Sequence, residues 1–143
     1  MKVSEVMTKN PVIVTTDTPV IEIARLMRDK RIGSVILVEE ERPLGVVTER
    51  DLVHRVLAEN RDLEKIKAGD EASKPVIAIN IHGDVEDAIQ TMTDYKIRRL
   101  VVVDNKDKVV GINTTDDLGY NLRSMSEDLA IRYILMTQRG KTN

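Results

Sequence analysis

An internal repeat constrains the fold of this chain more than any other feature of its sequence. Residues 45–52 read GVVTERDL, and residues 111–118 read GINTTDDL. Each copy has a Gly, a Thr three positions later and an Asp three positions after the Thr. The flanking residues also correspond, since an apolar stretch follows both Pro11 and Pro75. The 143 residues therefore predict two structural units of the same kind.

The hydrophobic pattern predicts the same order of elements in both units. A short apolar run after a Pro indicates a strand, and apolar residues at helical spacing follow it. Next come a continuous β-branched run, typical of a strand covered on both faces, a charged turn, another strand and a second helix. Each unit is thus expected to be strand, helix, strand, strand, helix, which gives a mixed α+β fold. The stretches that carry this order are 7–16, 19–32, 33–40 and 42–57 in the first unit, and 72–80, 84–97, 98–105 and 107–122 in the second.

Local signals predict where several helices start and end. Thr18 precedes a Pro and is expected to cap a helix whose first residue is that Pro. Asp84 takes the capping role in the second unit. Gly69 is expected to end a short helix in the polar segment between the units. Ser124 and Glu127 are spaced as a capping box for a helix near the end of the chain.

The repeat also sets the expected domain boundaries. Residues 1–60 form the first unit, residues 61–71 a linker and residues 72–123 the second unit. Residues 124–143 form a tail helix, whose apolar stripe predicts docking on the chain's own body or on a partner. The residues of this stripe, which starts just ahead of the helix, are Leu122, Met125, Leu129, Tyr133 and Met136.

Composition argues against several classes of function. The chain has no Cys, which excludes disulfides, thiol catalysis and thiolate metal sites. The net charge is −2 with 32% charged residues, and neither Phe nor Trp occurs, so nucleic-acid binding is not expected. No apolar run approaches the length of a membrane span, and the N-terminal residues lack the apolar core of a signal peptide. We therefore expect a cytoplasmic protein with no membrane partner.

The repeated Thr-x-x-Asp string has two interpretations. Thr48 and Asp51, like Thr114 and Asp117, match a capping box in which each residue's side chain accepts from the other's amide. Under this interpretation the Gly of each string only lets a strand pass close to a neighbour. The same residues suit a nucleotide, because a helix N-terminus binds an anion and a carboxylate accepts two hydrogen bonds from a cis-diol. Both interpretations stay open on residue types, and the repetition strengthens the second.

Together these features resemble a tandem pair of CBS domains, the module named after cystathionine β-synthase. The resemblance is carried above all by residues 45–52 and 111–118, and also by the openings PVIVTT and PVIAIN, the strand SVILV and the stretch RRLVVVD. The resemblance covers about Val3 to Leu122, and over this range the chain is similar to the stand-alone CBS-pair proteins common in archaea and bacteria. It implies that the two repeats pack through their sheets as a pseudo-twofold pair.

The family resemblance implies two clefts that bind adenosine-containing ligands such as AMP, ADP, ATP or S-adenosylmethionine. Each cleft is composite, with the Thr and the ribose-binding Asp from one repeat and the adenine-facing strand and basic residues from the other. The residues implied for one cleft are Thr48, Asp51, Ala78, Asn80, Ile97, Arg98 and Arg99. The residues implied for the other are Thr114, Asp117, Thr15, Thr16, Arg31, Ile32 and Ser34.

The two implied clefts are expected to differ. Residues 95–104 are very similar to a phosphate-binding strand in the γ subunit of AMP-activated protein kinase, and guanidinium groups bind phosphate in bidentate fashion. Because Arg98 and Arg99 lie in this stretch, the cleft of Asp51 is expected to bind phosphate more tightly. The alternative is that the two arginines are solvated charges at the start of a strand. Asn113 stands where the family usually has a β-branched or apolar residue, and its amide would meet ligand or solvent.

The resemblance implies a regulatory module that senses adenine nucleotides as a homodimer, with a regulated protein as a further partner. The nucleotide is a ligand, and no cofactor is required. No enzyme activity or metal site is expected, because the chain offers no paired acid and base, and His54 and His82 lie in different contexts. The alternatives are an S-adenosylmethionine-binding module, a ligand-free structural dimeriser, a nucleic-acid binder and a nucleotide-acting enzyme.

Overall fold

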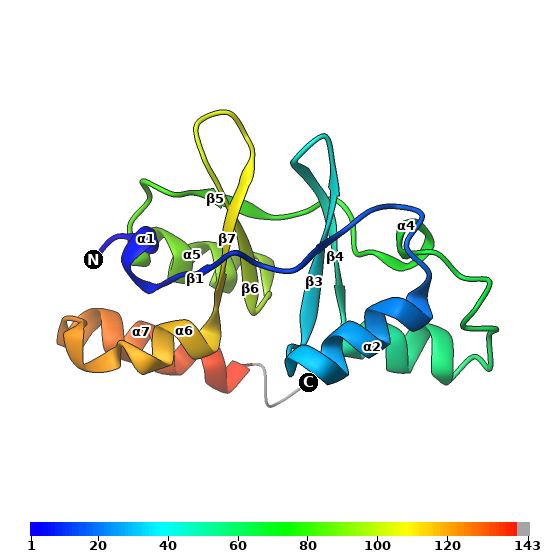
Figure 1. Ribbon diagram of the computed structural model, residues 1–143. Coiled ribbons are helices and arrows are strands. Elements are labelled where there is room, and N and C mark those ends of the chain that lie inside the picture. Colours follow the sequence, from blue (N-terminus) through cyan, green and yellow to red (C-terminus); the bar gives the residue numbers. More distant parts are fainter. Residues whose placement is uncertain (140–143) are drawn as a thin grey trace. The chain divides into compact units, whose positions relative to one another are not determined.

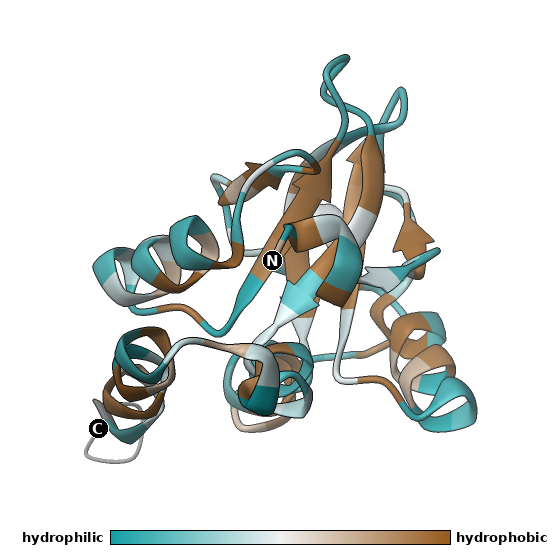
Figure 2. Ribbon diagram, turned by 90° about the vertical axis from the view of Figure 1, so that its left-hand side faces the viewer, coloured by the Kyte–Doolittle hydropathy of each residue, from teal (hydrophilic) through white to brown (hydrophobic). Residues whose placement is uncertain are grey.

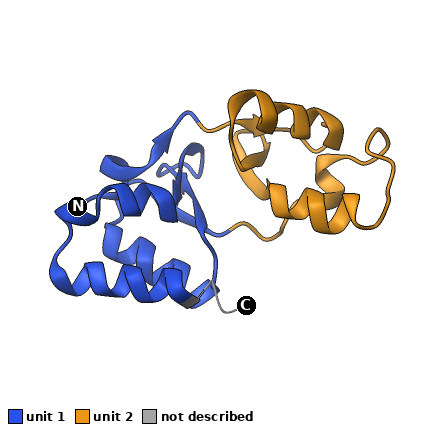
Figure 3. Cartoon of the chain, turned by 90° about the horizontal axis from the view of Figure 1, so that it is seen from below, with its two compact units in different colours: residues 1–10, 77–143 blue, residues 11–76 orange. Residues whose placement is uncertain are grey.

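The chain folds into two compact units that do not coincide with the two sequence repeats (Figure 3). The computed structural model describes residues 1–139, so residues 140–143 of the expected tail helix lie outside the described residues. Unit 2 comprises Pro11–Val76, and unit 1 comprises Met1–Asn10 together with the chain from Ile77 onward. The first ten residues therefore belong with the second repeat.

Unit 2 has the strand, helix, strand, strand, helix order expected for the first repeat. Its sheet has the order β2-β3-β4, with β2 parallel and β4 antiparallel to β3. Ile23 and Met27 of its long helix α2 pack into one core with Val35 and Leu37 of β3. The elements are β2 (Ile13–Val14), α2 (Val20–Lys30), β3 (Ser34–Glu39), β4 (Arg42–Thr48), α3 (Glu49–Asp51), the π-helix η1 (Leu52–Leu57) and α4 (Ala68–Glu71).

Two predicted helix boundaries in unit 2 are wrong. Pro19 is the N-cap of α2, with an extended backbone, and is not its first residue. Thr18 does not cap the helix, because its hydroxyl accepts a hydrogen bond from Thr15 N at 3.1 Å. Gly69 lies inside α4 rather than at its end, and its amide donates to Thr16 O at 3.0 Å. In both places a hydrogen bond within the unit, rather than the local sequence signal, determines the role of the residue at the helix end.

Unit 1 repeats the same order and adds elements from both ends of the chain (Figure 1). Its sheet has the order β1-β7-β6-β5. β5 is parallel to β6, and β7 is antiparallel to both β6 and β1. The elements are α1 (Val3–Val6), β1 (Thr8–Lys9), β5 (Ala78–Asn80), α5 (Val85–Tyr95), β6 (Arg99–Val103), β7 (Val109–Thr114), α6 (Thr115–Tyr120), the 3-10 helix η2 (Leu122–Ser124) and α7 (Glu127–Arg139).

Burial and charge explain why the N-terminal residues join unit 1. Val3 and Val6 of α1 lie in the same buried core as Leu100 of β6. Lys2 forms an ion pair of 3.0 Å with Asp84, which is the N-cap of α5 as the sequence predicts. Figure 2 shows apolar residues along the strands and polar residues on the outer turns of the helices. The N-terminal segment thus contributes apolar side chains that the core of unit 1 needs.

The tail helix α7 docks on unit 1. Leu129, Tyr133 and Met136 pack against the core of that unit, which confirms the predicted apolar stripe. Arg132 donates a hydrogen bond of 2.9 Å to Glu86 on α5. The docked position therefore combines apolar burial with an ion pair at its margin.

The predicted cap of the tail helix is wrong by two residues. Ser126, not Ser124, caps α7, because Ser126 Oγ accepts from Leu129 N at 3.2 Å. Ser124 instead ends the 3-10 helix η2 that precedes α7. The short 3-10 turn could not be separated from the start of the helix by sequence spacing.

The Gly of each repeated string allows a close backbone approach, as predicted. A Cβ on Gly45 would lie 2.8 Å from Ser73 O, and a Cβ on Gly111 would lie 2.9 Å from Thr8 O. Ser73 lies beside β4 and Thr8 lies beside β7, at corresponding places in the two units. Any larger residue would push this segment away from the strand that leads to the Thr-x-x-Asp string.

Candidate ligand-binding site

Both Thr-x-x-Asp strings form capping boxes with the same geometry. Thr48 Oγ1 accepts from Asp51 N at 3.2 Å, and Asp51 Oδ2 accepts from Thr48 N at 2.9 Å. The corresponding distances between Thr114 and Asp117 are 3.2 and 2.9 Å. The capping interpretation is therefore confirmed. It leaves room for a ligand, because the box uses Oδ2 alone and a carboxylate offers about four acceptor positions.

In unit 2 the box stands where β4 meets α3. Thr48 lies opposite Ser34 of β3, and Glu49 N donates to Gly33 O at 3.0 Å. Arg31 is exposed at the end of α2, where its backbone is left-handed with φ of 54°. Ser34 is therefore a neighbour of Thr48 within its own unit.

The corresponding corner of unit 1 carries the two predicted arginines. Thr114 lies opposite Arg99, and Thr115 N donates to Arg98 O at 3.0 Å. Arg98 is exposed, whereas Arg99 is partly buried. Arg99 Nε is buried without a hydrogen-bond partner among the described residues. A guanidinium N–H in this state is suited to an anionic acceptor.

The other predicted residues of unit 1 lie at β5 and just before β6. Ala78 is exposed, and Ile97 is partly buried against the core. Asn80, the last residue of β5, is already engaged, since its Nδ2 donates to Asn105 Oδ1 in the turn after β6 at 3.0 Å and its Oδ1 accepts from His82 N at 2.9 Å. Ala78 and Asn80 therefore lie in β5, an edge strand of the unit 1 sheet, and Ile97 precedes the neighbouring strand β6.

The other predicted residues of unit 2 follow β2 and precede β3. Thr15 Oγ1 lies 3.3 Å from Thr18 Oγ1, and Thr16 O accepts from Gly69 N. Ile32 packs against the core of the unit. Thr15 is exposed and Thr16 partly exposed, so their hydroxyls lie at the surface of the turn after β2.

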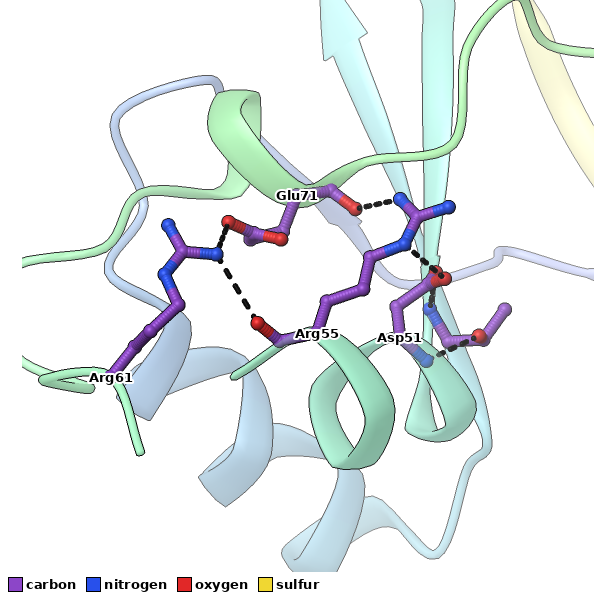
Figure 4. Close-up of polar contacts among 5 residues, drawn as sticks. Asp51, Arg55, Arg61 and Glu71 are labelled. Carbon is purple, nitrogen blue, oxygen red and sulfur yellow. Dashed lines mark hydrogen bonds and ion pairs between the residues drawn. The ribbon is translucent and has the colours of Figure 1, made fainter. Parts of the chain in front are cut away.

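The two box carboxylates differ in the partner of their second oxygen. Asp117 Oδ1 accepts a hydrogen bond of 3.0 Å from Thr8 Oγ1. Asp51 Oδ1 instead lies 3.9 Å from Arg55 Nε, as Figure 4 shows. Neither partner was predicted from the sequence. Arg55 follows Asp51 by four residues in a helical stretch, which is a detectable signal, whereas Thr8 depends on the pairing of β1 with β7.

A buried carboxylate lies beyond Arg55 in unit 2. Glu71 is 4% exposed, and its carboxylate is paired with the Arg61 guanidinium (Figure 4). Arg55 Nη1 donates to Glu71 O at 3.3 Å, and Arg61 Nη1 donates to Arg55 O at 3.3 Å. This polar network connects α4 to the helical segment that carries Asp51.

Asn113 is a buried polar residue without a partner. It is 0% exposed, and neither its Oδ1 nor its Nδ2 has a hydrogen-bond partner among the described residues. It lies opposite Leu100 of the unit 1 core, so the alternative that its amide meets solvent is wrong, and the alternative that it meets a ligand stays a prediction. Val47 takes the corresponding position in the core of unit 2.

The tail helix contacts the helix that carries Asp117. Tyr133 OH donates to Thr115 O at 2.9 Å. Burial, together with the negative charge of Asp116, raises the pKa of Tyr133 above its ordinary value. The neutral phenol is therefore the form that holds α7 against α6.

Two further features concern metals and membranes. Among residues 1–139, no group of three or more His, Cys, Asp or Glu side chains is arranged to hold a metal ion. None of the helices in the described part of the chain is both long enough and apolar enough to cross a bilayer.

The fold and the paired boxes define a class of protein. The CBS domain model matches residues 3–58 and 68–118, once for each repeat. The chain therefore belongs to the CBS domain family and carries two CBS domains.

Individual relatives agree with this assignment. Uncharacterized protein MK0525 of Methanopyrus kandleri is 37% identical over 119 residues, which cover 82% of this chain and 61% of that protein. The chain thus spans about three fifths of the length of this relative. CBS domain protein PAE2072 of Pyrobaculum aerophilum, solved in complex with AMP, is 25% identical with a TM-score of 0.79, and the match covers 94% of this chain and 99% of that one. The CBS domain pair of protein MJ0100, solved in complex with 5′-methylthioadenosine and S-adenosyl-L-methionine, is also 25% identical, with a TM-score of 0.75 and coverages of 84% and 98%.

Proposed function

We propose that this CBS pair is a regulatory module that binds an adenine nucleotide, AMP, ADP or ATP, through the Asp51 and Asp117 carboxylates. One observation carries the proposal. Each capping box uses only Oδ2 of its Asp, and Oδ1, which faces Arg55 in Asp51 and accepts from Thr8 in Asp117, keeps further acceptor capacity for a ribose diol. The AMP complex of PAE2072, a relative by fold and sequence, supports the choice of ligand.

The residues proposed to bind the ligand are those that the family resemblance implies. In this proposal Arg99 contributes a guanidinium whose Nε has no acceptor within the described part of the chain. The ligand shifts the protein between two conformations only by its difference in affinity for them. The proposed output is a change in the binding of a regulated protein by a homodimer of this chain, without catalysis.

S-adenosylmethionine is the second candidate ligand. The CBS pair of MJ0100 was solved with this compound and with 5′-methylthioadenosine, neither of which carries a phosphate. If Arg98 and Arg99 bind phosphate, nucleotides will bind more tightly than either of these compounds. If the two arginines are surface charges, the preference will be weak or reversed.

A ligand-free structural dimeriser is the third candidate, because both Thr–Asp pairs already act as caps. The variants Asp51→Asn and Asp117→Asn separate the roles, since the Asn Oδ1 can still accept from the Thr amide of the box but carries no charge. A purely capping role predicts that the Asn variants are nearly as stable as the wild type and that neither wild type nor variants bind a ligand. A ligand role predicts lost affinity with stability nearly unchanged.

The experiment is calorimetric titration of the purified protein with AMP, ADP, ATP and S-adenosylmethionine, together with thermal unfolding. At a ligand concentration of 100 times the Kd, stability should rise by about 2.7 kcal/mol. The Asn variants should lose this gain, and Glu49→Gln, which changes an exposed neighbour in α3, should keep it. If none of the four compounds binds or moves the melting temperature, the nucleotide-sensing proposal is overturned.

A further inference from the structure

The two capping boxes are alike in backbone but differ in the residue placed four positions after the Asp. In unit 1 this residue is Asn121, whose Nδ2 donates to Asp117 O of the backbone at 2.8 Å. In unit 2 it is Arg55, whose Nε lies 3.9 Å from Asp51 Oδ1 of the carboxylate. Among the described residues, a cation therefore faces the carboxylate of Asp51 but not that of Asp117.

Arg55 is held in this place by contacts on both sides. Its Nη1 donates to Glu71 O, and its own backbone carbonyl accepts from Arg61 Nη1, each at 3.3 Å. Arg61 is in turn paired with the Glu71 carboxylate, which is almost fully buried. Figure 4 shows the Arg55 side chain running between Glu71 and Asp51. The guanidinium thus lies between the Glu71 carbonyl of α4 and the Asp51 carboxylate, while Arg61 holds the backbone of Arg55.

The local backbone is unusual at the same point. The α-helical turn that carries Asp51 passes directly into the π-helix η1. Ala58 N donates to Val53 O at 2.9 Å and Arg61 N donates to Val56 O at 3.1 Å, so each bond spans five residues. Short π-helical segments are frequent at functional sites. In the corresponding place, unit 1 has the regular helix α6.

We propose that Arg55 is a positioning residue for Asp51, which holds the carboxylate in the orientation that accepts a ligand's diol, and that Glu71 in turn positions Arg55. This inference rests on the proposed function of the Asp51 site. It distinguishes the two sites, because Asp51 depends on a neighbouring cation while Asp117 depends on the hydroxyl of Thr8. It also predicts that Arg55 acts through Asp51 and not by touching a phosphate.

The test uses Arg55→Met in the Asp117→Asn background, where binding is confined to the Asp51 site, with Arg50→Met as the matched control on an exposed residue of α3. Adenosine, AMP and ATP are titrated by calorimetry. Because the Arg55 side chain is 51% exposed, affinity should fall by about two- to fivefold. The factor should be the same for all three compounds, including adenosine, which has no phosphate. Arg50→Met should leave all three affinities unchanged.

Other results would decide against the inference. A loss for AMP and ATP that spares adenosine would make Arg55 a direct phosphate contact and overturn the positioning role. Unchanged affinities for all three compounds would do the same. Arg55→Lys, which keeps the charge without the planar fork, should recover part of the loss, and no recovery would show that packing rather than charge is responsible.

An amide resonance tests the contact without any ligand. Thr48 N–H donates to the Asp51 carboxylate, so its 1H–15N resonance should shift in Arg55→Met and stay unchanged in Arg50→Met. The Thr114 amide, which has the same role in the other box, is the internal control. If the wild type binds none of the three compounds but the Thr48 resonance shifts, the proposed function fails while the Arg55–Asp51 contact stands. An unmoved Thr48 resonance contradicts the positioning role.

Discussion

Thr8 Oγ1 donates a hydrogen bond of 3.0 Å to Asp117 Oδ1, although Thr8 lies in the first strand of the chain and Asp117 in a helix of the second repeat. In unit 2 the corresponding carboxylate oxygen faces the Arg55 guanidinium. The two capping boxes therefore have the same geometry, but the second carboxylate oxygen contacts a hydroxyl in one box and a guanidinium in the other. The difference arises from residues outside the repeated strings.

Thr8→Val is expected to lower the free energy of unfolding by about 1 kcal/mol, because a hydrogen bond to a charged acceptor is lost. Urea denaturation measures the change. In the Asp117→Asn background the same substitution should cost clearly less, since the charged acceptor is gone. Ser73→Ala, at the corresponding position of unit 2, should change stability by less than about 0.5 kcal/mol. If Thr8→Val lowers the free energy of unfolding equally in the wild type and in Asp117→Asn, Asp117 is not the hydrogen-bond partner of Thr8.

Asn113→Val is expected to stabilise the protein by about 1–3 kcal/mol, because it removes buried amide atoms that have no partner in residues 1–139. Valine fits this environment in unit 2, where Val47 is fully buried. The reciprocal change Val47→Asn should destabilise by a similar amount. Both are measured by chemical denaturation. A loss of stability in Asn113→Val would show that the amide has a partner, such as a bound water molecule.

Arg61→Ala is expected to destabilise the protein by about 2–3 kcal/mol, since it leaves the buried Glu71 carboxylate without its cation. The figure is below that of a fully buried pair because the Arg61 side chain is partly exposed. Adding Glu71→Gln should restore part of the loss, because the charge that needs pairing is removed. Equilibrium unfolding of both variants checks this, and an additive double mutant would refute the pairing.

Tyr133→Phe is expected to cost about 0.5–1.5 kcal/mol through loss of the hydrogen bond to Thr115 O. The wild type should also lose stability at high pH. The folded state holds the Tyr133 pKa above its ordinary value of 10.0, so the unfolded state releases the proton first. This contribution is fully present below about pH 10 and disappears as the pH rises through the folded-state pKa.

The phenol's role is checked by measuring stability from pH 8 to pH 11 in wild type and Tyr133→Phe. The two curves should converge at the alkaline end. Tyr120→Phe is the matched control, because Tyr120 is 87% exposed and should leave both the stability and its pH dependence unchanged. Parallel curves for wild type and Tyr133→Phe would contradict the assignment.

The order of elements and both capping boxes could be predicted from the sequence, because the signals are local and occur twice. The strand SVILV is buried and the Thr48 and Asp51 side chains interact as their spacing indicates. Helix starts were less predictable. Thr18 and Ser124 both look like caps, but one bonds within its own turn and the other ends a 3-10 helix.

The partners of the site could not be predicted from sequence spacing, because they depend on pairings between distant segments. Thr8 reaches Asp117 only because β1 pairs with β7. Glu71 meets Arg61 only because α4 folds back beside the helical segment that follows Asp51. Asn113 was recognised as a departure from the family pattern, but its burial follows from the register of β7 on β6.

The pairing of β1 with β7 makes the chain's division into repeats unsuitable as a guide for cutting it. A fragment that starts at Ile77 lacks the strand that covers β7, so it leaves backbone groups open at a sheet edge, where other chains can pair. It also lacks Val3 and Val6 of the core. During synthesis these first residues leave the ribosome well before β7 has been made, so unit 1 can be completed only after unit 2 has been translated.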